Sequence, residues 1–406
     1  MNVSLASIQA AAQRIRGAIY RSPCPESFAL SRLCGATISC KFEHLQRTGS
    51  FKERGARNKL MLLTAAERAR GVIAASAGNH ALGLAYHGQD LGIPVTVVMP
   101  KTAPLVKITN CRALGANTVL HGENLEEARV RARELAAQDQ AIYIHGFDDP
   151  DIIDGQGTIG LEILEDHPDV DAVIVPVGGG GLIAGVALAI KALAPHVRII
   201  GVESDRAASL HESLARGVVT RCATKPTIAD GLAVSEVGSL CFDIIRTTVD
   251  EVVLVKEANI ASAVLKMLEL EKTVVEGSAA VPLAAMLSHD LGLQGKRVVL
   301  ILGGGNIDVT VLARIIERGL VMDGRLCRYL VQISDRPGSL ARLLTCIAET
   351  GASIKEVTHD RSFGPADVAL TAVAIILETR DRDHIAEVGR VLLAAGFQAR
   401  LDNHRE

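Results

Sequence analysis

The feature of this sequence that most restricts its fold is a repeated alternation of short β-branched runs with longer stretches rich in alanine, leucine and charge. Such runs are typical of buried strands, and the stretches between them have the spacing of helices. The expected strands are residues 72–75, 95–99, 117–120, 141–144, 172–177, 198–203, 251–255 and 297–302. This alternation predicts parallel βαβ units, and so an α/β fold with open, mostly parallel sheets. Such sheets bind ligands beyond the carboxyl ends of their strands.

Composition narrows the classes of protein that this chain can be. Its 406 residues suffice for two or three domains. The 43 basic and 46 acidic side chains give a formal net charge of -3, so neither nucleic acid nor an anionic membrane is an expected partner. The eight cysteines show no CxxC pair and no spacing typical of metal ligands. We therefore predict a cytoplasmic protein with reduced thiols, no metal and a small-molecule partner.

Two stretches resemble membrane segments at first inspection. Residues 2–20 space their apolar side chains helically, which predicts an amphipathic helix rather than a signal peptide. Residues 172–190 carry no charge, but they include Pro176 and four successive glycines, which would destabilise the interior of a helix. We expect a strand, a glycine loop and a buried helix there, and no membrane span.

Three loops contain residues that packing alone explains poorly. Lys52 follows a Gly-Ser pair at the start of a predicted helix, although a lone lysine is most simply a solvated surface residue. Residues 178–181 are glycines between a strand and a helix, where backbone N–H groups could approach a phosphate, or where glycine could serve only tight packing. Residues 76–80, Ser-Ala-Gly-Asn-His, also precede a helix and would suit a carboxylate, or would only cap the helix.

Residues 46–58, 76–80 and 178–182 together resemble the motifs of the fold-type II pyridoxal-phosphate (PLP) enzymes, specifically the threonine/serine dehydratases, and they occur in the family's order. The resemblance implies two α/β subdomains with PLP between them, held as a Schiff base of Lys52. A lysine suits this role because its amine becomes nucleophilic when its pKa is lowered. The implied reaction is deamination of threonine, and also of serine, in which β-elimination expels the β-hydroxyl as water and later hydrolysis releases ammonia, to give 2-oxobutanoate or pyruvate.

The resemblance also assigns roles to single residues. It implies that Lys52 is the catalytic residue and removes the α proton, and that Asn79 donates to the phenolic oxygen of the cofactor. The implied cofactor-binding residues are Phe51, Lys52, Asn79, Gly178, Gly179, Gly180, Gly181, Leu182 and Gly303. The implied substrate-binding residues are Ser76, Ala77, Gly78, Asn79 and His80.

The sequence departs from the family pattern at some positions. Gly303 replaces a residue that is usually serine, which leaves open what partners the pyridine nitrogen. Serine racemases carry a second serine, used as an acid and base, at the position of Ala77, and alanine cannot move a proton. Glu203, Ala207 and Ser209 match only part of the racemase metal segment. A serine racemase or a β-hydroxyaspartate ammonia-lyase of the same family stays an alternative, as does a non-catalytic amino-acid sensor.

The character of the sequence changes after residue 308. Residues 328–340, followed by an amphipathic helix, resemble the start of the ACT domain, an α+β amino-acid sensor with βαββαβ order and a ferredoxin-like fold. The resemblance implies allosteric regulation by an amino acid, most plausibly isoleucine or valine as products of isoleucine biosynthesis and its neighbouring pathway. The implied effector-binding residues are Gly338, Ser339 and Leu340. The alternative is a dimerisation domain that binds no ligand.

These observations together predict the domain organisation. We expect a PLP-dependent catalytic domain over residues 1–318, with a small subdomain of about 53–147 inserted in the large one. A linker over 319–326 and an ACT domain over 327–406 are expected to follow. The expected assembly is a homo-oligomer, either a dimer or a tetramer.

Overall fold

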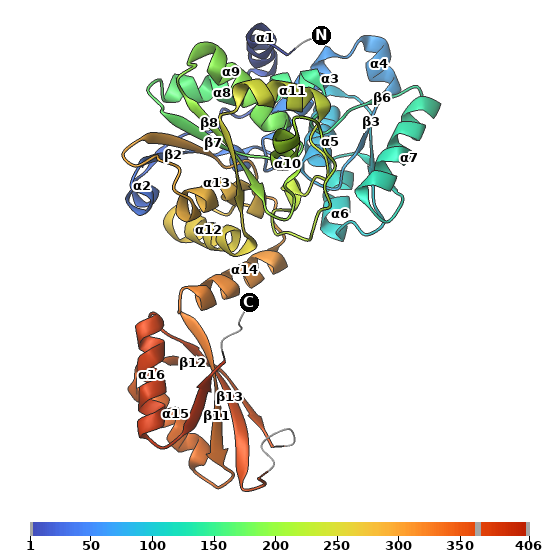
Figure 1. The fold of residues 1–406 in the computed structure, drawn as a ribbon. Helices are drawn as coiled ribbons and strands as arrows, with labels where there is room; N and C mark the ends of the chain where they lie inside the picture. The colour runs from blue at the N-terminus through green and yellow to red at the C-terminus, as the bar shows by residue number, and fades with distance from the viewer. Residues whose placement is uncertain (1–2, 362–366, 403–406) are drawn as a thin grey trace. The chain divides into compact units, whose positions relative to one another are not determined.

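The computed structural model describes residues 3–361 and 367–402, and the chain forms two compact units that divide between Asp308 and Val309 (Figure 1). The first unit contains two sheets. The strands of the larger sheet are β1 (Glu26–Ser27), β2 (Thr37–Lys41), β7 (Ala172–Pro176), β8 (Arg198–Ser204), β9 (Glu251–Val255) and β10 (Arg297–Ile301). The strands of the smaller sheet are β3 (Val72–Ala75), β4 (Val95–Met99), β5 (Asn117–Leu120) and β6 (Ile142–Tyr143).

Both sheets have the pattern of open α/β folds. The larger has the order β1-β2-β10-β7-β8-β9, in which β1 is antiparallel to β2 and all other pairs are parallel. The smaller has the order β5-β4-β3-β6 and is parallel throughout. The predicted α/β fold with mostly parallel sheets is therefore confirmed.

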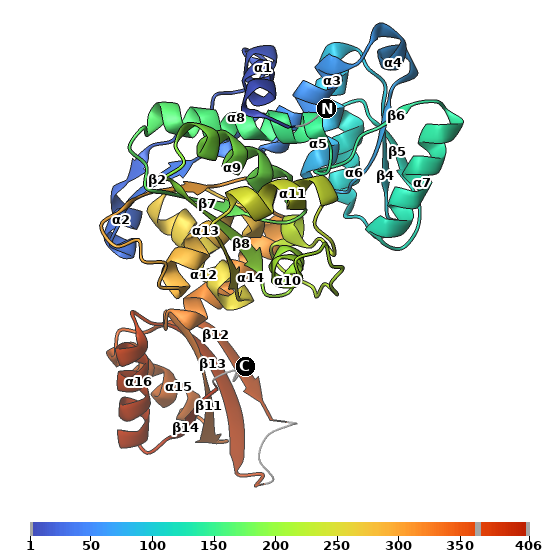
Figure 2. The same cartoon turned by 45° about the horizontal axis from the view of Figure 1, so that its top comes forward.

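Helices cover both faces of the smaller sheet, and Figure 2 shows α7 (Leu125–Gln138) on one side and α5 (Asn79–Leu91) on the other. Alternate residues explain this arrangement. Ala74 of β3 packs in the cluster that contains α5, whereas its neighbour Ile73 packs in the cluster that contains α7. A strand buried on both faces must be apolar at every position, which is why the sequence shows continuous apolar runs.

The larger sheet is covered by α8 (Pro150–Asp166) and α9 (Gly181–Leu193) on one face, and by α12 (Glu257–Leu270) and α13 (Gly277–Ser288) on the other (Figure 2). Helices α8 and α9 approach each other closely, because a Cβ at Gly185 would lie 2.4 Å from the carbonyl oxygen of Ile153. The remaining helices of this unit are α1 (Leu5–Ile15), α2 (Phe28–Cys34), η1 (Glu43–Leu45), α3 (Lys52–Leu62), α4 (Ala65–Arg70), α6 (Leu105–Ala113), α10 (Ser209–Arg216), η2 (Asp230–Leu232) and α11 (Ser239–Thr248).

The second unit is a small α+β domain, as predicted. Its elements are α14 (Val309–Met322), β11 (Leu326–Ser334), α15 (Ser339–Glu349), β12 (Ser353–Asp360), β13 (Leu370–Glu378), α16 (Arg382–Ala394) and β14 (Gln398–Leu401). From β11 onward the order is βαββαβ, and the antiparallel sheet has the order β12-β13-β11-β14. Val331 and Ile375 of the sheet pack with Leu343 of α15 and Val388 of α16.

Two predicted boundaries differ from the structure. The first helix, expected over residues 2–20, begins at Leu5, where Ser4 caps it, and ends at Ile15, shortly before Gly17 with a φ of +78°. Helix α14 runs to Met322, although the linker was expected to begin at residue 319. Gly319 is the first proline or glycine after residue 309, so the sequence predicts that the helix ends before it. In the structure the helix continues through this single glycine to Met322.

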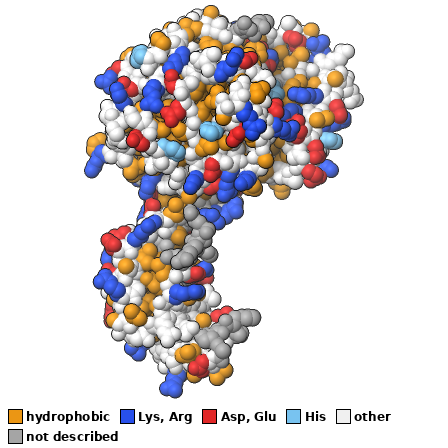
Figure 3. Space-filling model, in the orientation of Figure 1, with side chains coloured by type: hydrophobic (Ala, Val, Ile, Leu, Met, Phe, Trp, Pro, Cys, Tyr) orange, Lys and Arg blue, Asp and Glu red, His pale blue; other side chains and the backbone are white. Residues whose placement is uncertain are grey.

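The surface and the cysteines add little that is unusual. Figure 3 shows acidic, basic and apolar side chains interspersed over the visible face of the first unit. All eight cysteines lie among the described residues and are free. No helix within residues 3–361 and 367–402 is long and apolar enough to cross a membrane.

Candidate active site

Lys52 is the first residue of α3, and its Nζ atom donates a hydrogen bond to the carbonyl oxygen of Gly146, at 2.6 Å. The preceding residue is also fixed, because the backbone N–H of Phe51 donates to the carbonyl oxygen of Gly303, at 3.0 Å. The Nζ atom lies 5.2 Å from the centre of the Phe51 ring. The lysine is therefore held between the small subdomain and the segment that follows β10.

The surroundings of Lys52 favour its neutral form. Burial lowers the pKa of this amine to about 8, and nearby Cys241 and Glu276 only partly oppose that effect. An amine with a pKa near neutral pH has an available lone pair, which is the form that attacks a carbonyl or accepts a proton.

A buried ionic cluster fixes the helix that begins at Lys52. Arg54, which is 1% exposed, pairs with Glu43 at 2.7 Å and with Glu162 of α8 at 2.7 Å. Lys41 at the end of β2 also binds Glu162, at 2.6 Å. Burial opposes ionisation of Glu43, but adjacent Arg54 outweighs it and keeps the pKa of Glu43 below its usual value. This cluster joins β2, α3 and α8, so that the position of Lys52 is set by the core of the larger subdomain.

Residues 76–78 form the loop between β3 and α5, and Asn79 and His80 begin that helix. The side-chain amide of Asn79 donates to both carboxylate oxygens of Glu276, at 3.0 and 3.2 Å. Its oxygen accepts a hydrogen bond from the amide of Asn306, at 2.8 Å. The structure therefore places the beginning of this helix beside residues of the larger subdomain.

His80 contributes a buried, neutral ring to this site. Its side chain is 4% exposed, and neither ring nitrogen has a hydrogen-bond partner among the described residues. Burial, followed by the charge of Lys52, lowers the pKa of His80 to about 3. The ring lies beside Gly146, since a Cβ on that glycine would be 3.6 Å from the imidazole. A histidine in these surroundings stays uncharged at neutral pH.

Residues 178–180 lie in the turn between β7 and α9, and Gly181 begins that helix, as the predicted strand, glycine loop and helix require. Gly180 has a φ of +95°, which favours glycine. A Cβ on Gly179 would lie 2.4 Å from the ring of Phe147, and one on Gly181 would lie 2.8 Å from its carbonyl oxygen. Close packing against Phe147 thus explains two of the glycines. The backbone N–H groups of residues 178–182 nevertheless have no hydrogen-bond acceptor within the described part of the chain.

This arrangement fits a cofactor that carries an aldehyde and a phosphate. The Lys52 amine suits the aldehyde, because its pKa is lowered and it lies inside the fold. The N–H groups of residues 178–182 suit the phosphate, because they begin helix α9 without a partner. Phe51 adds an aromatic ring beside the amine. The observations are an amine of lowered pKa, a set of N–H groups without an acceptor among the described residues, and an aromatic ring beside the amine.

Gly303 is explained by close packing as well as by its place in the chain. A Cβ at this position would lie 3.2 Å from a ring carbon of Phe51, so that a larger side chain would press on that ring. Gly303 offers only backbone to this side of the site. The contact with Phe51 gives a physical reason for glycine at this position.

The described residues contain no group of three or more histidine, cysteine or acidic side chains that could hold a metal ion. Glu203, at the end of β8, accepts hydrogen bonds from the backbone N–H groups of Leu210 and His211, at 2.9 and 2.8 Å. Burial raises the pKa of Glu203 to about 7. Because of its two hydrogen bonds to backbone N–H groups, the Glu203 side chain stabilises the first turn of α10.

Two residues near Lys52 were not found from the sequence. Gly146 contacts Lys52, and Glu276 binds Asn79. Neither belongs to a motif segment, because their proximity arises only when distant strands and helices come together. Glu276 carried one usable signal, since it is an acidic residue directly before the long uncharged helix α13.

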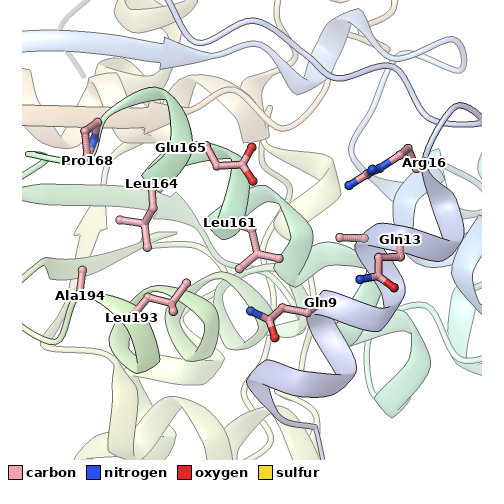
Figure 4. Close-up of a pocket in the computed structure, with 10 residues that line it drawn as sticks. Gln9, Gln13, Arg16, Leu161, Leu164, Glu165, Pro168, Leu193 and Ala194 are labelled. Carbon is pink, nitrogen blue, oxygen red and sulfur yellow. The ribbon is translucent and has the colours of Figure 1, made fainter.

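A separate hollow lies on the outer side of α8 (Figure 4). Its volume is about 610 Å³. In Figure 4, Gln9 and Gln13 of α1 and Arg16 directly after that helix face Leu161 and Leu164 of α8. Lys52 and the two loops do not line it. It is therefore distinct from the site around the lysine.

Comparison with known proteins agrees with these observations. The family model described as "Pyridoxal-phosphate dependent enzyme" matches residues 15–304. An L-threonine ammonia-lyase of Thermotoga maritima is 46% identical over 399 residues, which cover 98% of this chain and 99% of the relative. The structure of the processed form of threonine deaminase isoform 2 from Solanum lycopersicum is similar with a TM-score of 0.73 at 40% identity, and covers 77% of this chain and 92% of that chain. Maize serine racemase has a TM-score of 0.74 at 33% identity, over 79% and 99% of the two chains.

Proposed function

This chain belongs to the pyridoxal-phosphate-dependent enzyme family, and from that premise we propose that it is an L-threonine ammonia-lyase, a carbon–nitrogen lyase that forms 2-oxobutanoate and ammonia. The observation that carries the proposal is the partly buried Lys52, whose pKa is lowered to about 8, in a site that also contains N–H groups without an acceptor among the described residues. The relative from Thermotoga maritima with this activity in its name matches the chain over almost its whole length. The match of the family model to residues 15–304 confirms the family resemblance found in the sequence.

In this reaction the residues of the site would have separate roles. When bound, PLP withdraws electrons from the α carbon of the amino acid and so makes the α proton removable. The amine of Lys52 would bind the cofactor and, in the substrate complex, accept the α proton at Nζ. The N–H groups of residues 178–182 would hold the phosphate, and the ring of Phe51 would support the cofactor's plane. The loop of residues 76–80 would bind the substrate carboxylate at the N-terminus of α5.

Elimination is favoured over racemisation by one residue. A racemase needs a second proton carrier on the face opposite the lysine, and Ala77 has only a methyl group. The resemblance of the first unit to maize serine racemase concerns the fold that both reactions use. A β-hydroxyaspartate ammonia-lyase would use the same proton transfer, so that product analysis has to separate it from the threonine enzyme.

We assign the second unit to regulation, as an ACT domain that binds an amino-acid effector. Its βαββαβ order and the turn before α15 support this assignment. Gly338 in that turn has a φ of +88°, and a Cβ there would meet nothing within 4 Å. The N–H of Ser339 donates to the carbonyl oxygen of Arg336, so this amide serves the turn. The space at Gly338 would admit a ligand carboxylate.

The proposed domain bounds follow from the division of the chain between Asp308 and Val309, ten residues before the expected end of the catalytic domain at residue 318. Residues 1–308 would form the catalytic domain, residues 309–326 would connect the domains through α14, and residues 327–406 would form the ACT domain. A homo-oligomer and a cytoplasmic location belong to the same proposal. The free cysteines are consistent with a reducing compartment.

The experiment that tests the function is a product analysis across β-hydroxy amino acids. Purified protein supplied with PLP is incubated with L-threonine, L-serine and β-hydroxyaspartate, and the 2-oxo acid and ammonia are measured in each reaction. We expect equal amounts of both products, with the highest kcat/KM for L-threonine. A higher kcat/KM for β-hydroxyaspartate, or D-serine as the main product from L-serine, would replace the proposal with the corresponding alternative.

A further inference from the structure

A buried carboxylate outside the predicted site, that of Glu276, lies where the two subdomains meet. Glu276 is 7% exposed and occupies the N-cap position of α13, yet its side chain makes no capping hydrogen bond to that helix. It accepts instead from the amide of Asn79, at 3.0 and 3.2 Å, and from the hydroxyl of Ser278, at 2.5 Å. Glu276 thus does not bind the backbone N–H groups at the start of α13, and binds instead an amide that is distant in the sequence. This arrangement requires an explanation.

The chain provides a fitted space for this carboxylate. A Cβ on Gly304 would lie 2.7 Å from Oε1 of Glu276, and a Cβ on Gly231 would lie 3.4 Å from the same atom. The backbone N–H of Glu276 donates to the carbonyl oxygen of Gly304, at 3.0 Å. Two glycines from separate segments of the chain thus leave room for the carboxylate. The backbone hydrogen bond to Gly304 fixes the position of the Glu276 backbone from which the side chain extends.

The other side of Asn79 is fixed too. Asn306 donates to the side-chain oxygen of Asn79, at 2.8 Å, and to the carbonyl oxygen of Thr48, at 2.7 Å. A carboxylate and a backbone carbonyl can only accept hydrogen bonds, so the amide of Asn79 has one orientation that satisfies all these groups. Its nitrogen must face Glu276 and its oxygen must face Asn306.

The charge of Glu276 is also placed near the reactive amine. Burial raises the pKa of Glu276, although the hydrogen bonds from Ser278 and Asn79 oppose the rise. The carboxylate in turn acts against the lowering of the Lys52 pKa. A buried carboxylate is costly unless such partners compensate for it.

We propose that Glu276 is a positioning residue, which sets the orientation of the Asn79 amide and holds the first turn of α5 beside Lys52. Asn79 is the first residue of α5, so a fixed Asn79 also fixes the N-terminus at which the substrate carboxylate would bind. The inference rests on the proposed function for the identity of the ligands. The network itself consists of contacts within this chain.

The first test needs no cofactor and no substrate. Hydrogen–deuterium exchange of residues 76–82 is compared in cofactor-free wild type and Glu276→Gln. A glutamine amide has one acceptor oxygen in place of two, so we expect exchange to rise by about tenfold, in line with the loss of one charge-assisted hydrogen bond. Glu203→Gln is the matched control, because Glu203 is also buried, at 0% exposed against 7% for Glu276, and binds the first turn of α10 instead of α5. Unchanged exchange in Glu276→Gln would overturn the proposal.

The second test asks whether Glu276 acts through Asn79. The dissociation constant and the absorption spectrum of bound PLP are measured for wild type, Glu276→Gln, Asn79→Ala and the double variant. If Glu276 acts through Asn79, its substitution changes both quantities in the wild-type background and changes neither once Asn79 is alanine. Additive effects of the two substitutions would overturn the proposal. These readouts do not depend on which amino acid is the substrate, so a failure of the lyase assignment stays distinguishable.

Discussion

The Nζ atom of Lys52 lies 2.6 Å from the carbonyl oxygen of Gly146, so that the first residue of α3 is joined to the segment that follows β6. The same segment continues to Phe147, which packs on the glycine loop, and to Asp148. The carboxylate of Asp148 accepts from the backbone N–H groups of Ser239 and Leu240, at 3.1 and 3.0 Å. One short loop therefore contacts the lysine, the glycine turn and the N-terminus of α11.

The ionisation of Lys52 gives a prediction for the cofactor-free protein. Burial lowers its pKa from 10.5 to about 8, so the rate of labelling by an amine reagent should rise with a midpoint near pH 8. Free Nα-acetyl-lysine, labelled under the same conditions, is the control and should show the ordinary lysine midpoint of about 10.4. Mass spectrometry of the labelled peptide and of the labelled control measures both midpoints. Equal midpoints would contradict a buried amine.

The same shift predicts the direction of a stability change with pH. Between about pH 8 and pH 10.5 the unfolded chain holds a proton on Lys52 that the folded chain has lost. Stability therefore rises with pH across this window because of Lys52, and the gain should be absent in Lys52→Met. Urea denaturation of cofactor-free wild type and variant at pH 7.5 and 9.5 gives the difference.

The buried ionic cluster predicts a large loss of stability when its centre is removed. Arg54→Ala would leave Glu43 without its principal cation in a buried position, at a cost of about 3–5 kcal/mol. Arg297→Ala is the control, because Arg297 pairs with Asp169 at the surface and both side chains are more than half exposed. Its loss should cost less than about 1 kcal/mol. Denaturant midpoints compare the two, and similar effects would contradict the assigned role of the cluster.

The contact between Gly179 and Phe147 predicts a paired effect on cofactor binding. Gly179→Ala places a methyl group where the ring lies, so the loop must move and the affinity for PLP should fall by at least about tenfold. Phe147→Ala removes the obstacle, and the double variant should bind PLP more tightly than Gly179→Ala alone. Absorbance titration with PLP measures these affinities. No recovery in the double variant would show that the ring is not the obstacle.

Ala77 predicts that elimination proceeds without appreciable racemisation. Chiral chromatography of the serine left after partial turnover should show L-serine only, because no proton carrier lies at this position. Ala77→Ser adds a hydroxyl with little added volume and is the matched comparison. Formation of D-serine by the wild type at a rate comparable to 2-oxo acid formation would contradict the assignment.

Gly338 predicts where an effector carboxylate binds. Gly338→Asp adds a negative charge at this turn, so binding of isoleucine or valine should weaken strongly. Gly338→Asn is the control, because it has nearly the same shape, tolerates a positive φ and carries no charge. Calorimetry on the intact chain compares the three proteins. If neither amino acid binds to the wild type, these two effectors are excluded. If no member of a wider amino-acid panel binds, the alternative of a dimerisation domain without a ligand is favoured.

The sequence was informative where the structure depends on local pattern. Strand runs such as 95–99 were found because both faces of the strand are buried, and the glycine turn was found because a positive φ and close packing demand glycine at Gly180 and Gly179. Glu276 and Gly146 were missed because their roles arise from contacts between segments far apart in the chain. The end of α14 was misplaced because helix termini depend on weak signals.

The most direct test of the central claim is the fate of L-threonine with wild type and Lys52→Ala, each saturated with PLP. The account predicts that the wild type forms 2-oxobutanoate and ammonia in equal amounts, and that borohydride treatment fixes PLP to the peptide that contains Lys52. It predicts that Lys52→Ala loses turnover by at least about 10²- to 10⁴-fold, the usual contribution of a positioned base. Turnover close to wild type in Lys52→Ala, or PLP fixed to another peptide, would contradict the account.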